Sequence, residues 1–254
     1  MVVIPLPAAD LKPETAAAFD NYIQRFQAEL EARSTPDNYL WLDQHRQQKT
    51  LVWMQQRIIE LRQSGGEKAG PDGVIQHWFG AIYLETATLE RARDMLLSYA
   101  DYKVFFKPQV LDSKLLKRDG NRFDATLRLQ KRQVTQVVLN AEMTADFAAL
   151  DAKHVSISSR STRIAEMKHA GKADSTRQEL PPEDQNGYLW RWNIYWRLVQ
   201  SDVGVYAEAD LITLSRASGA MHPGRLLTGF QTFPREMTEA FFDGLTRAFP
   251  PLRK

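Results

Sequence analysis

Few side chains in this sequence combine a reactive type with a position suited to acid–base chemistry. His77, beside Trp78 in an apolar segment, is the best placed of the five histidines. Histidine exchanges a proton near neutral pH, although a single histidine on a strand more often has a structural role. The other candidates are the polar positions Arg191, Asn193 and Tyr195 in the segment GYLWRWNIYWRLVQ. One interpretation makes these residues and His77 the polar wall of a cavity, with Tyr195 as a proton donor.

The motifs of the common metal- and nucleotide-dependent enzymes are missing. The sequence has no cysteine, which excludes thiolate catalysis and cysteine-ligated metals. It also has no HExxH pair, EF-hand loop, GxSxG elbow, Walker A loop or GxGxxG turn. We therefore expect neither a metal site nor a cofactor.

The largest concentration of aromatic surface lies at alternate positions of the same segment. Trp190, Trp192 and Trp196 share one parity, and a period of two is typical of a strand. These rings could stack on a flat or lipid-like ligand. Alternatively, they simply pack against a closing helix through Met237 and Phe241. Both interpretations stay open, because a ligand cavity here would be an unfilled part of the core.

The tryptophans belong to a predicted hairpin over residues 187–216, with SDVG as its turn. In the register set by that turn, Arg197 lies opposite Glu208 and Trp196 lies opposite Ala209. Opposite charges then share one face and a bulky residue meets a small one on the other, as cross-strand pairing favours. We expect the charged face to be solvated.

A basic residue on an apolar parity is a further candidate binding group. Ser159 and Arg163 share that parity with the apolar residues Val155, Ile157, Ala165 and Met167. If this face is concave, Arg163 points inward and needs an anionic partner, such as a ligand carboxylate or phosphate. A bulge in the strand would instead turn Arg163 outward.

The elements that must position these residues follow a simple order. Asp10 is expected to cap a first helix that ends at STPD, residues 34–37. A second helical segment at 39–54 and an ambiguous one at 57–63, for which we favour a strand, lead to the turn-rich connector 64–73. The predicted later elements are strands at 74–84, 110–118, 121–132, 135–147 and 154–167, a helix from 88, the hairpin, and a closing helix after Pro234. We expect an N-terminal helical extension at 1–70 and a main α+β domain at 71–254.

Composition narrows the class of protein. The 254 residues are 43% hydrophobic and 25% charged with a formal net charge of +2, which is ordinary for a globular protein and advertises no nucleic-acid surface. No apolar run is long enough to span a membrane, and the opening MVVIPLP is a poor signal peptide. We expect a soluble protein, either cytoplasmic or exported by a signal outside this sequence. The oligomeric state stays open.

Several segments are similar to the START-like (SRPBCC) helix-grip superfamily, which includes polyketide cyclases and lipid-transfer proteins. They are IQHWFGAIYL, LLSYADYKVFFKPQV, SISSRSTRIAEM, the hairpin and FPREMTEAFF. The resemblance covers about residues 73–249 and points to a bacterial subgroup. It implies a curved antiparallel sheet wrapped around a long C-terminal helix, with a cavity between them for an apolar or aromatic ligand.

The sequence thus favours a binding module for a hydrophobic small molecule or lipid. The residues predicted to line its cavity are Leu127, Leu139, Ser159, Arg163, Trp190, Trp192, Trp196, Met237 and Phe241. The alternative is a cyclase/aromatase-type enzyme acting on a polyketide-like substrate in the same cavity, with Tyr195 or His77 moving protons. A third interpretation, a protein-interaction domain that uses the N-terminal helices, has the least support.

Overall fold

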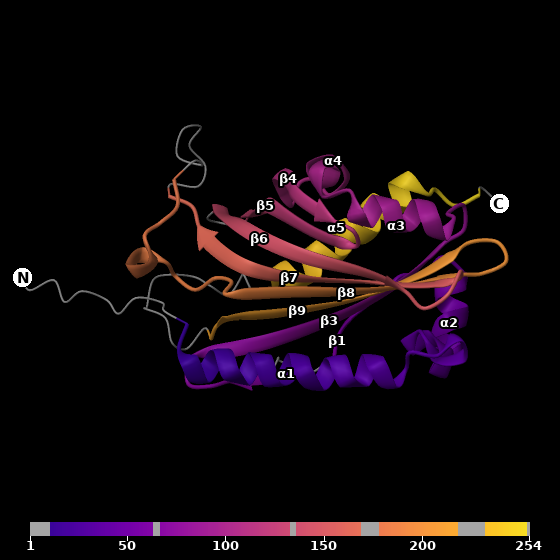
Figure 1. The fold of residues 1–254 in the computed structure, drawn as a ribbon, viewed down its shortest axis with the longest axis horizontal. Coiled ribbons are helices and arrows are strands. Elements are labelled where there is room, and N and C mark those ends of the chain that lie inside the picture. The colour runs from indigo at the N-terminus through magenta and orange to yellow at the C-terminus, as the bar shows by residue number, and fades with distance from the viewer. Residues whose placement is uncertain (1–10, 63–66, 133–135, 169–177, 218–231, 253–254) are drawn as a thin grey trace, which may run out of the picture.

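The computed structural model describes residues 11–62, 67–132, 136–168, 178–217 and 232–252, which form an antiparallel sheet with helices on both faces (Figure 1). In these ranges the sheet has nine strands in the order β1-β3-β9-β8-β7-β6-β5-β4, with β2 also paired to β3. The strands are β1 (Ile58–Leu61), β2 (Glu67–Ala69), β3 (Gly73–Leu84), β4 (Val110–Asp119), β5 (Arg122–Arg132), β6 (Gln136–Ala149), β7 (His154–Glu166), β8 (Arg191–Gln200) and β9 (Val205–Arg216). The helices are α1 (Pro13–Ala32), α2 (Arg46–Trp53), α3 (Leu89–Leu97), α4 (Tyr102–Phe105) and α5 (Phe233–Ala248), and short 3-10 turns include η1 (Pro36–Asn38) and η2 (Trp41–Gln44).

The two faces of the sheet are covered by opposite ends of the chain. Helices α3, α4 and α5 lie on one face, named here the inner face, and α1 lies on the other, the outer face (Figure 1). Helix α5 packs on β3 and β9, and a side chain at Gly80 of β3 would come within 2.7 Å of the Phe242 ring. The expected α+β helix-grip architecture, an antiparallel sheet around a C-terminal helix, is therefore confirmed.

The strand patterns and the hairpin register are confirmed as well. Arg197 lies opposite Glu208 and Trp196 opposite Ala209, and the turn closes through an N–H of Ser201 that donates to the Gly204 carbonyl at 2.7 Å. The ambiguous segment at 57–63 contains a strand, β1, which pairs with β3. These elements were predictable because their apolar positions recur with a period of two between clear turn residues.

The N-terminal region departs from its pattern in detail. Residues 39–54 hold the 3-10 turn η2 before the shorter helix α2. Helix α1 begins at Pro13, where proline suits the first helical position; the expected cap Asp10 is outside the described residues. No helix in the described ranges is long and apolar enough to cross a membrane.

The charged face of the hairpin is buried, so the expectation that it is solvated was wrong. Arg197 is 6% exposed and Glu208 is 2% exposed, because α1 and the turns that follow it cover this part of the outer face. A polar face of a strand is exposed only if no other segment covers it, and the alternation of residues along the strand carries no information on that.

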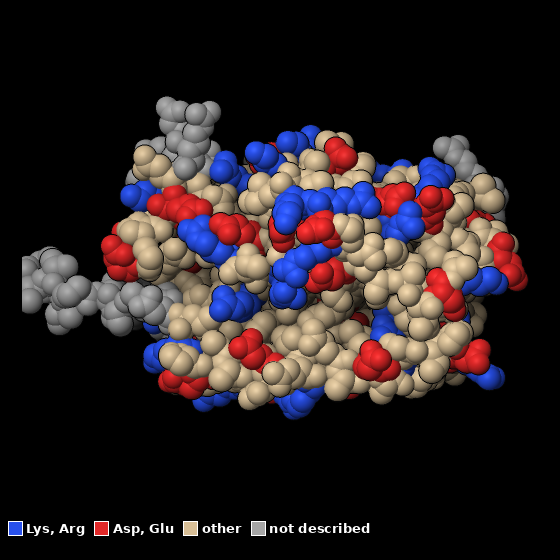
Figure 2. Space-filling model, viewed as in Figure 1, with Lys and Arg blue, Asp and Glu red and all other residues tan. Residues whose placement is uncertain are grey.

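On the side open to view in Figure 2, Lys and Arg are mixed with Asp and Glu.

Both buried charges bond to the backbone of the N-terminal segment. The Arg197 guanidinium donates to the carbonyls of Leu30, Arg33 (3.3 Å) and Tyr39 (2.5 Å), at and beyond the end of α1. Helix ends carry carbonyls without intrahelical partners, and a cation there is favourable. Burial lowers the pKa of Arg197, so these acceptors offset the desolvation of its charge.

The Glu208 carboxylate completes the same anchor from the neighbouring strand. Its two oxygens accept the backbone N–H groups of Trp41 and Leu42, each at 2.8 Å, where η2 begins. Arg197 and Glu208 therefore fix where α1 ends and where η2 starts. The boundary predicted near residue 70 stays a prediction, although β1 belongs to the same sheet as the later strands.

Truncating Trp196 should test the packing of the inner face. This side chain is 2% exposed and meets Phe241 of α5 edge to face, with ring centroids 5.7 Å apart. We expect Trp196→Ala to lower the free energy of unfolding by about 3–5 kcal/mol. Denaturant titration measures this loss, and a loss below about 1 kcal/mol would contradict the described packing.

Protonation of Glu208 should make stability depend on pH. Burial raises the pKa of Glu208 to about 7 from 4.5, against the effect of the Leu42 and Trp41 N–H groups. The folded protein then holds this proton more tightly than the unfolded chain. Its stabilising contribution is complete below pH 4.5 and is lost as the pH rises to about 7.

The measurement is the free energy of unfolding of the wild type and of Glu208→Gln between pH 4 and 8. Glutamine keeps the size and cannot titrate, so the stability of the wild type should fall relative to the variant as the pH rises. The expected relative fall is about 3 kcal/mol, since one pKa unit corresponds to about 1.4 kcal/mol. Parallel curves for the two proteins would contradict the raised pKa.

Candidate functional site

The inner face brings together most of the residues predicted to line a ligand cavity. Each is buried at this face or on α5, and all but Ser159 belong to one apolar cluster. They are Leu127, Leu139, Ser159, Trp192, Trp196, Met237 and Phe241. The first five lie on strands β5 to β8, at the alternate positions that point to the inner face. The last two lie on α5. Their role in binding stays a prediction.

One half of this interior is filled by aromatic side chains. Trp196 contacts Phe241 and Phe242 of α5, and Phe241 in turn meets Phe106 edge to face at 4.7 Å between ring centroids. Met237 and Phe242 are fully buried. A ligand in this half would have to displace core side chains.

Elsewhere on the inner face, where side chains such as Trp192 are also buried, some polar atoms lack partners. Within the described ranges, Trp192 Nε1, Thr213 Oγ1 and Trp78 Nε1 are buried and accept or donate no hydrogen bond. Thr213 lies directly opposite Trp192, and Trp78 lies opposite Leu211, the next inward residue of β9. The three atoms therefore belong to two consecutive rows of the inner face, which lie about 7 and 13 Å along β8 from Trp196.

Such atoms are informative because a buried polar group without a partner costs about 1–3 kcal/mol. An indole N–H can only donate, whereas a threonine hydroxyl can donate or accept. A bound oxygen acceptor would remove the cost at the two indoles. The alternating pattern of the sequence shows which residues point inward, but it does not show which of their polar atoms find partners.

A buried hydroxyl pair lies on the same face. Tyr99 Oη is 2.7 Å from Ser159 Oγ, and the Tyr99 ring stacks on Tyr102 with centroids 4.8 Å apart. Burial raises the pKa of Tyr99 to about 12. At neutral pH this phenol therefore keeps its proton and can act as a hydrogen-bond donor.

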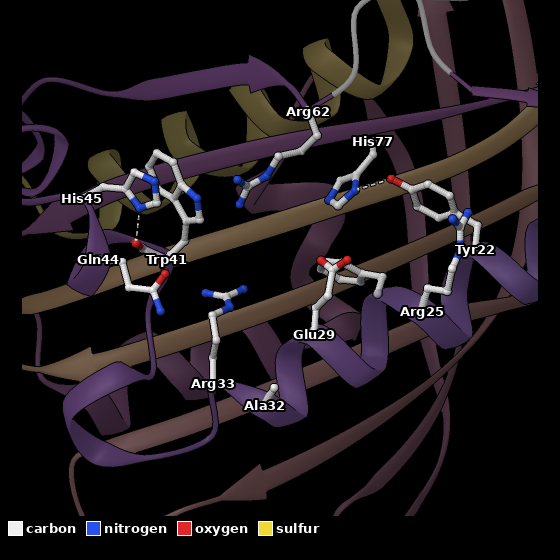
Figure 3. A pocket seen from close by; sticks show the side chains of 11 residues that line it. Tyr22, Arg25, Glu29, Ala32, Arg33, Trp41, Gln44, His45, Arg62 and His77 are labelled. Carbon is white, nitrogen blue, oxygen red and sulfur yellow. Dashed lines mark hydrogen bonds between the residues drawn. The ribbon is translucent and has the colours of Figure 1, made fainter.

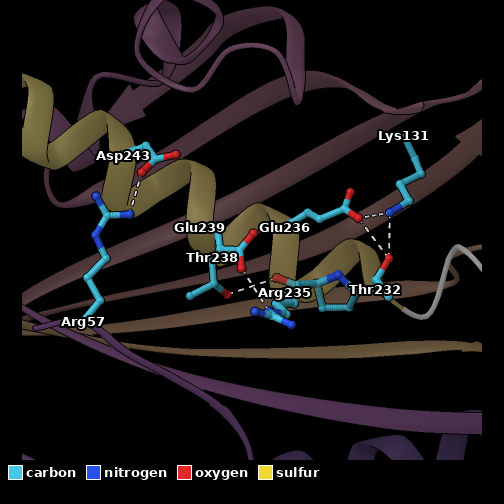
Figure 4. Close-up of polar contacts among 9 residues, drawn as sticks. Arg57, Lys131, Thr232, Arg235, Glu236, Thr238, Glu239 and Asp243 are labelled. Atoms are coloured by element: carbon cyan, nitrogen blue, oxygen red, sulfur yellow. Dashed lines mark hydrogen bonds and ion pairs between the residues drawn. The ribbon is translucent and has the colours of Figure 1, made fainter. Parts of the chain in front are cut away.

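A buried lysine ties the start of α5 to the sheet (Figure 4). Lys131 of β5 is 3% exposed; its Nζ donates to Thr232 Oγ1 at 2.7 Å and forms an ion pair with Glu236. Farther along the helix, Arg57 pairs with Asp243 at 2.5 Å (Figure 4). These contacts hold α5 at both ends over the interior.

The inward orientation expected for Arg163 is wrong. Between β6 and β7 the register shifts, so that Glu142 pairs with Arg163 but Met143 pairs with Ser161. The extra residue, Thr162, forms a bulge that reverses the parity, as the alternative interpretation allowed. The Arg163 side chain is 49% exposed and forms ion pairs with Glu179 and Glu142.

Trp190 also departs from the predicted row. Strand β8 begins only at Arg191, and Trp190 packs partly buried against the outer-face cluster that contains Phe19 and Phe26 of α1. Its indole therefore lies on the opposite face from Trp192 and Trp196. The shared parity of the three tryptophans fails where the regular strand starts.

The residues proposed as a polar wall lie at the outer face instead of the inner one. His77 and Tyr195 are 5% exposed and Asn193 is 6% exposed beneath α1, and Arg191 is partly buried beside them. Tyr195 Oη accepts from Gln27 and Asn193, each at 3.3 Å. These groups are separated by the sheet from the inner face, so they cannot move protons there.

In the described ranges no three His, Asp or Glu side chains are placed to hold a metal ion. The most developed polar cluster is instead a chain of three side chains on the outer face. His77 Nδ1 is 2.8 Å from Tyr22 Oη, and His77 Nε2 is 2.7 Å from Asp210 Oδ1. Sequence reasoning singled out His77 but missed both partners, which lie 55 and 133 residues away.

Comparison with known proteins adds likenesses of fold. No family model matches the chain, and no curated protein matches it in sequence. Among solved structures, a STAR-related lipid transfer protein from Xanthomonas axonopodis has 15% identity and a TM-score of 0.47, over 74% of this chain and 98% of that one. The lipid transfer and protein localization domain of human StarD13 has 8% identity and a TM-score of 0.47, over 84% and 98%. The Zhui aromatase/cyclase from Streptomyces sp. R1128 has 12% identity and a TM-score of 0.45, over 68% and 93%. At such low identity and similarity, the function has to be inferred from this chain's own residues.

Proposed function

We propose that the chain is a binding module for a hydrophobic small molecule or lipid, held between the inner face of the sheet and α5. The observation that carries the proposal is the group of unpartnered polar atoms at Trp192, Thr213 and Trp78. They lie beside the apolar cluster that covers most of this face. A ligand with an apolar body and an oxygen acceptor complements both features.

The two parts of such a ligand would contribute differently. Burial of its apolar surface provides the affinity, at roughly 25 cal/mol per Å². An ester, ketone or carboxylate oxygen near Trp192 would accept its indole N–H group and fix the orientation. Arg163, which we first expected to orient the ligand, is exposed and paired with Glu179, so it has no part in this proposal.

A second candidate is a cyclase/aromatase-type reaction in the same interior. The observation that favours it is the buried pair of Tyr99 and Ser159, whose hydroxyls lie on the inner face and could donate a proton or hydrogen bond to a substrate carbonyl. His77 and Tyr195 are excluded from this role by their position under α1. An enzyme would lose turnover but keep affinity in Tyr99→Phe, whereas a carrier has no turnover to lose.

The test compares two probes of similar size, methyl palmitate and octadecane, with the wild type and Trp192→Phe. Phenylalanine keeps an aromatic ring and removes the N–H. We expect the variant to bind the ester about 2- to 10-fold more weakly, the scale of one neutral hydrogen bond, with little change for the alkane. Displacement of a fluorescent fatty-acid ester measures both affinities.

Trp196→Phe is the matched control, because it makes the same reduction in size at another buried position of the inner face. It should weaken the ester and the alkane equally or leave both unchanged. If Trp192→Phe also affects both probes equally, the indole N–H does not orient the ligand. If neither probe binds the wild type, the proposed function is wrong.

A further inference from the structure

A separate cavity of about 520 Å³ lies between α1 and the outer face of the sheet (Figure 3). Residues from α1, the segment around η2, and strands β1 and β3 surround it, and we name it the α1 cavity. Three other pockets bordered by described residues hold 180 to 270 Å³. A volume of 300–1,000 Å³ is typical of sites for small organic molecules.

The charged side chains that line the α1 cavity are mostly cationic. Arg25, Arg33 and Arg62 face one lining carboxylate, Glu29. Arg25 lies at the rim and pairs with Glu67 at 3.1 Å. Arg33 and Arg62 point into the space from opposite sides, Arg33 from the end of α1 and Arg62 from the end of β1 (Figure 3).

Both inner guanidiniums have unused capacity for an anion. The Arg62 side chain is only 20% exposed and lies over the ring of Phe79 at 4.0 Å. Its carboxylate neighbour Asp210 is 3.6 Å away, beyond a good hydrogen bond. Arg33 Nη1 is buried and has no hydrogen-bond partner in the described part of the chain. A buried guanidinium favours an anionic partner.

The carboxylates beneath the α1 cavity are already engaged. Asp210 Oδ1 lies 2.7 Å from His77 Nε2, and the Tyr22 hydroxyl lies 2.8 Å from His77 Nδ1. Glu208 accepts the N–H groups of Trp41 and Leu42. Asp210 is also the ion-pair partner of Arg62 at 3.6 Å, and neither acid lines the cavity.

The remaining wall is aromatic and held in place. Trp41 stacks on His45 with ring centroids 3.5 Å apart, and the His45 ring is fixed by a 2.7 Å hydrogen bond between Nδ1 and the Trp41 carbonyl. Phe26 and Tyr22 border the opposite side. An occupant with an apolar ring would therefore find apolar surface next to the two guanidiniums.

We propose that the α1 cavity is a second binding site, for a small organic anion whose carboxylate or phosphate group is held between Arg33 and Arg62. Planar guanidiniums suit both groups because they offer paired N–H donors. The site lies across the sheet from the proposed hydrophobic site, and it does not depend on it.

The experiment measures binding of phenyl phosphate, phenylacetate and neutral 2-phenylethanol to the full chain by isothermal titration calorimetry. The wild type should bind at least one of the two anions saturably and 2-phenylethanol at least 10-fold more weakly. The anion that binds better identifies the source as a phosphate monoester or a carboxylic acid. Equal binding of all three compounds, or of none, would overturn the proposal.

Substitutions of the two inner arginines test where the anion binds. Arg33→Gln and Arg62→Lys should each weaken the preferred anion about 10-fold or more, the scale of a charged hydrogen bond; lysine at 62 keeps the charge and loses the fork. Arg57→Gln, which removes a guanidinium paired with Asp243 on α5, is the matched control and should bind as the wild type does. Thermal melts confirm that each variant is folded.

Unchanged affinity in folded Arg33→Gln would overturn the assignment of the anion to this cavity. A competition experiment separates the two sites: phenyl phosphate or phenylacetate should not displace a fluorescent fatty-acid ester. Displacement would mean that the anion occupies the inner face and that the α1 cavity is not its site. Failure of the ester to bind would leave this result intact, since the two measurements are independent.

Discussion

The arrangement of this protein depends on two ionisable side chains buried side by side on the outer face of the sheet. Arg197 and Glu208 are neighbours on β8 and β9, and neither could remain under a helix without strong hydrogen-bond partners. The partners are backbone groups of residues 30–42. The position of α1, the start of η2 and the shape of the cavity between them follow from that requirement.

The helices on the two faces of the sheet are therefore held by different interactions. On the inner face, small residues such as Gly80 and Ala209 allow α5 and its aromatic side chains to approach closely, and apolar burial provides the attraction. On the outer face an apolar stripe of α1, with Phe19 and Phe26, packs beside the buried polar groups. Apolar surface alone would not fix where α1 ends along the strands, whereas the hydrogen bonds of Arg197 do.

The elements of the fold were predictable from the sequence because they depend on near neighbours. The hairpin register follows from the SDVG turn and from alternation, and both are local. The burial of Arg197 and His77 was not predictable in the same way, because it depends on residues far away in the sequence. Arg197 bonds to Leu30, 167 residues away, and His77 bonds to Asp210, 133 residues away. Arg163 shows a different limit. One additional residue, Thr162, reverses which side chains of β7 point inward after it, and no turn residue in the sequence marks this bulge. The apolar residues that face inward were predictable from parity, but which polar atoms among them lack partners depends on the packing of the whole chain.

The long distance in sequence between α1 and the strands β8 and β9 has a consequence for protein synthesis. The end of α1 is anchored by Arg197, 167 residues later in the chain than Leu30. At 5–20 residues per second, a ribosome needs roughly 8 to 30 seconds to cover that distance. Throughout this interval strands β8 and β9 are missing, and with them Tyr195, Ile212 and Leu214 of the cluster that buries Phe19 and Phe26. Part of the surface that buries the apolar stripe of α1 is therefore among the last of the sheet to be synthesised.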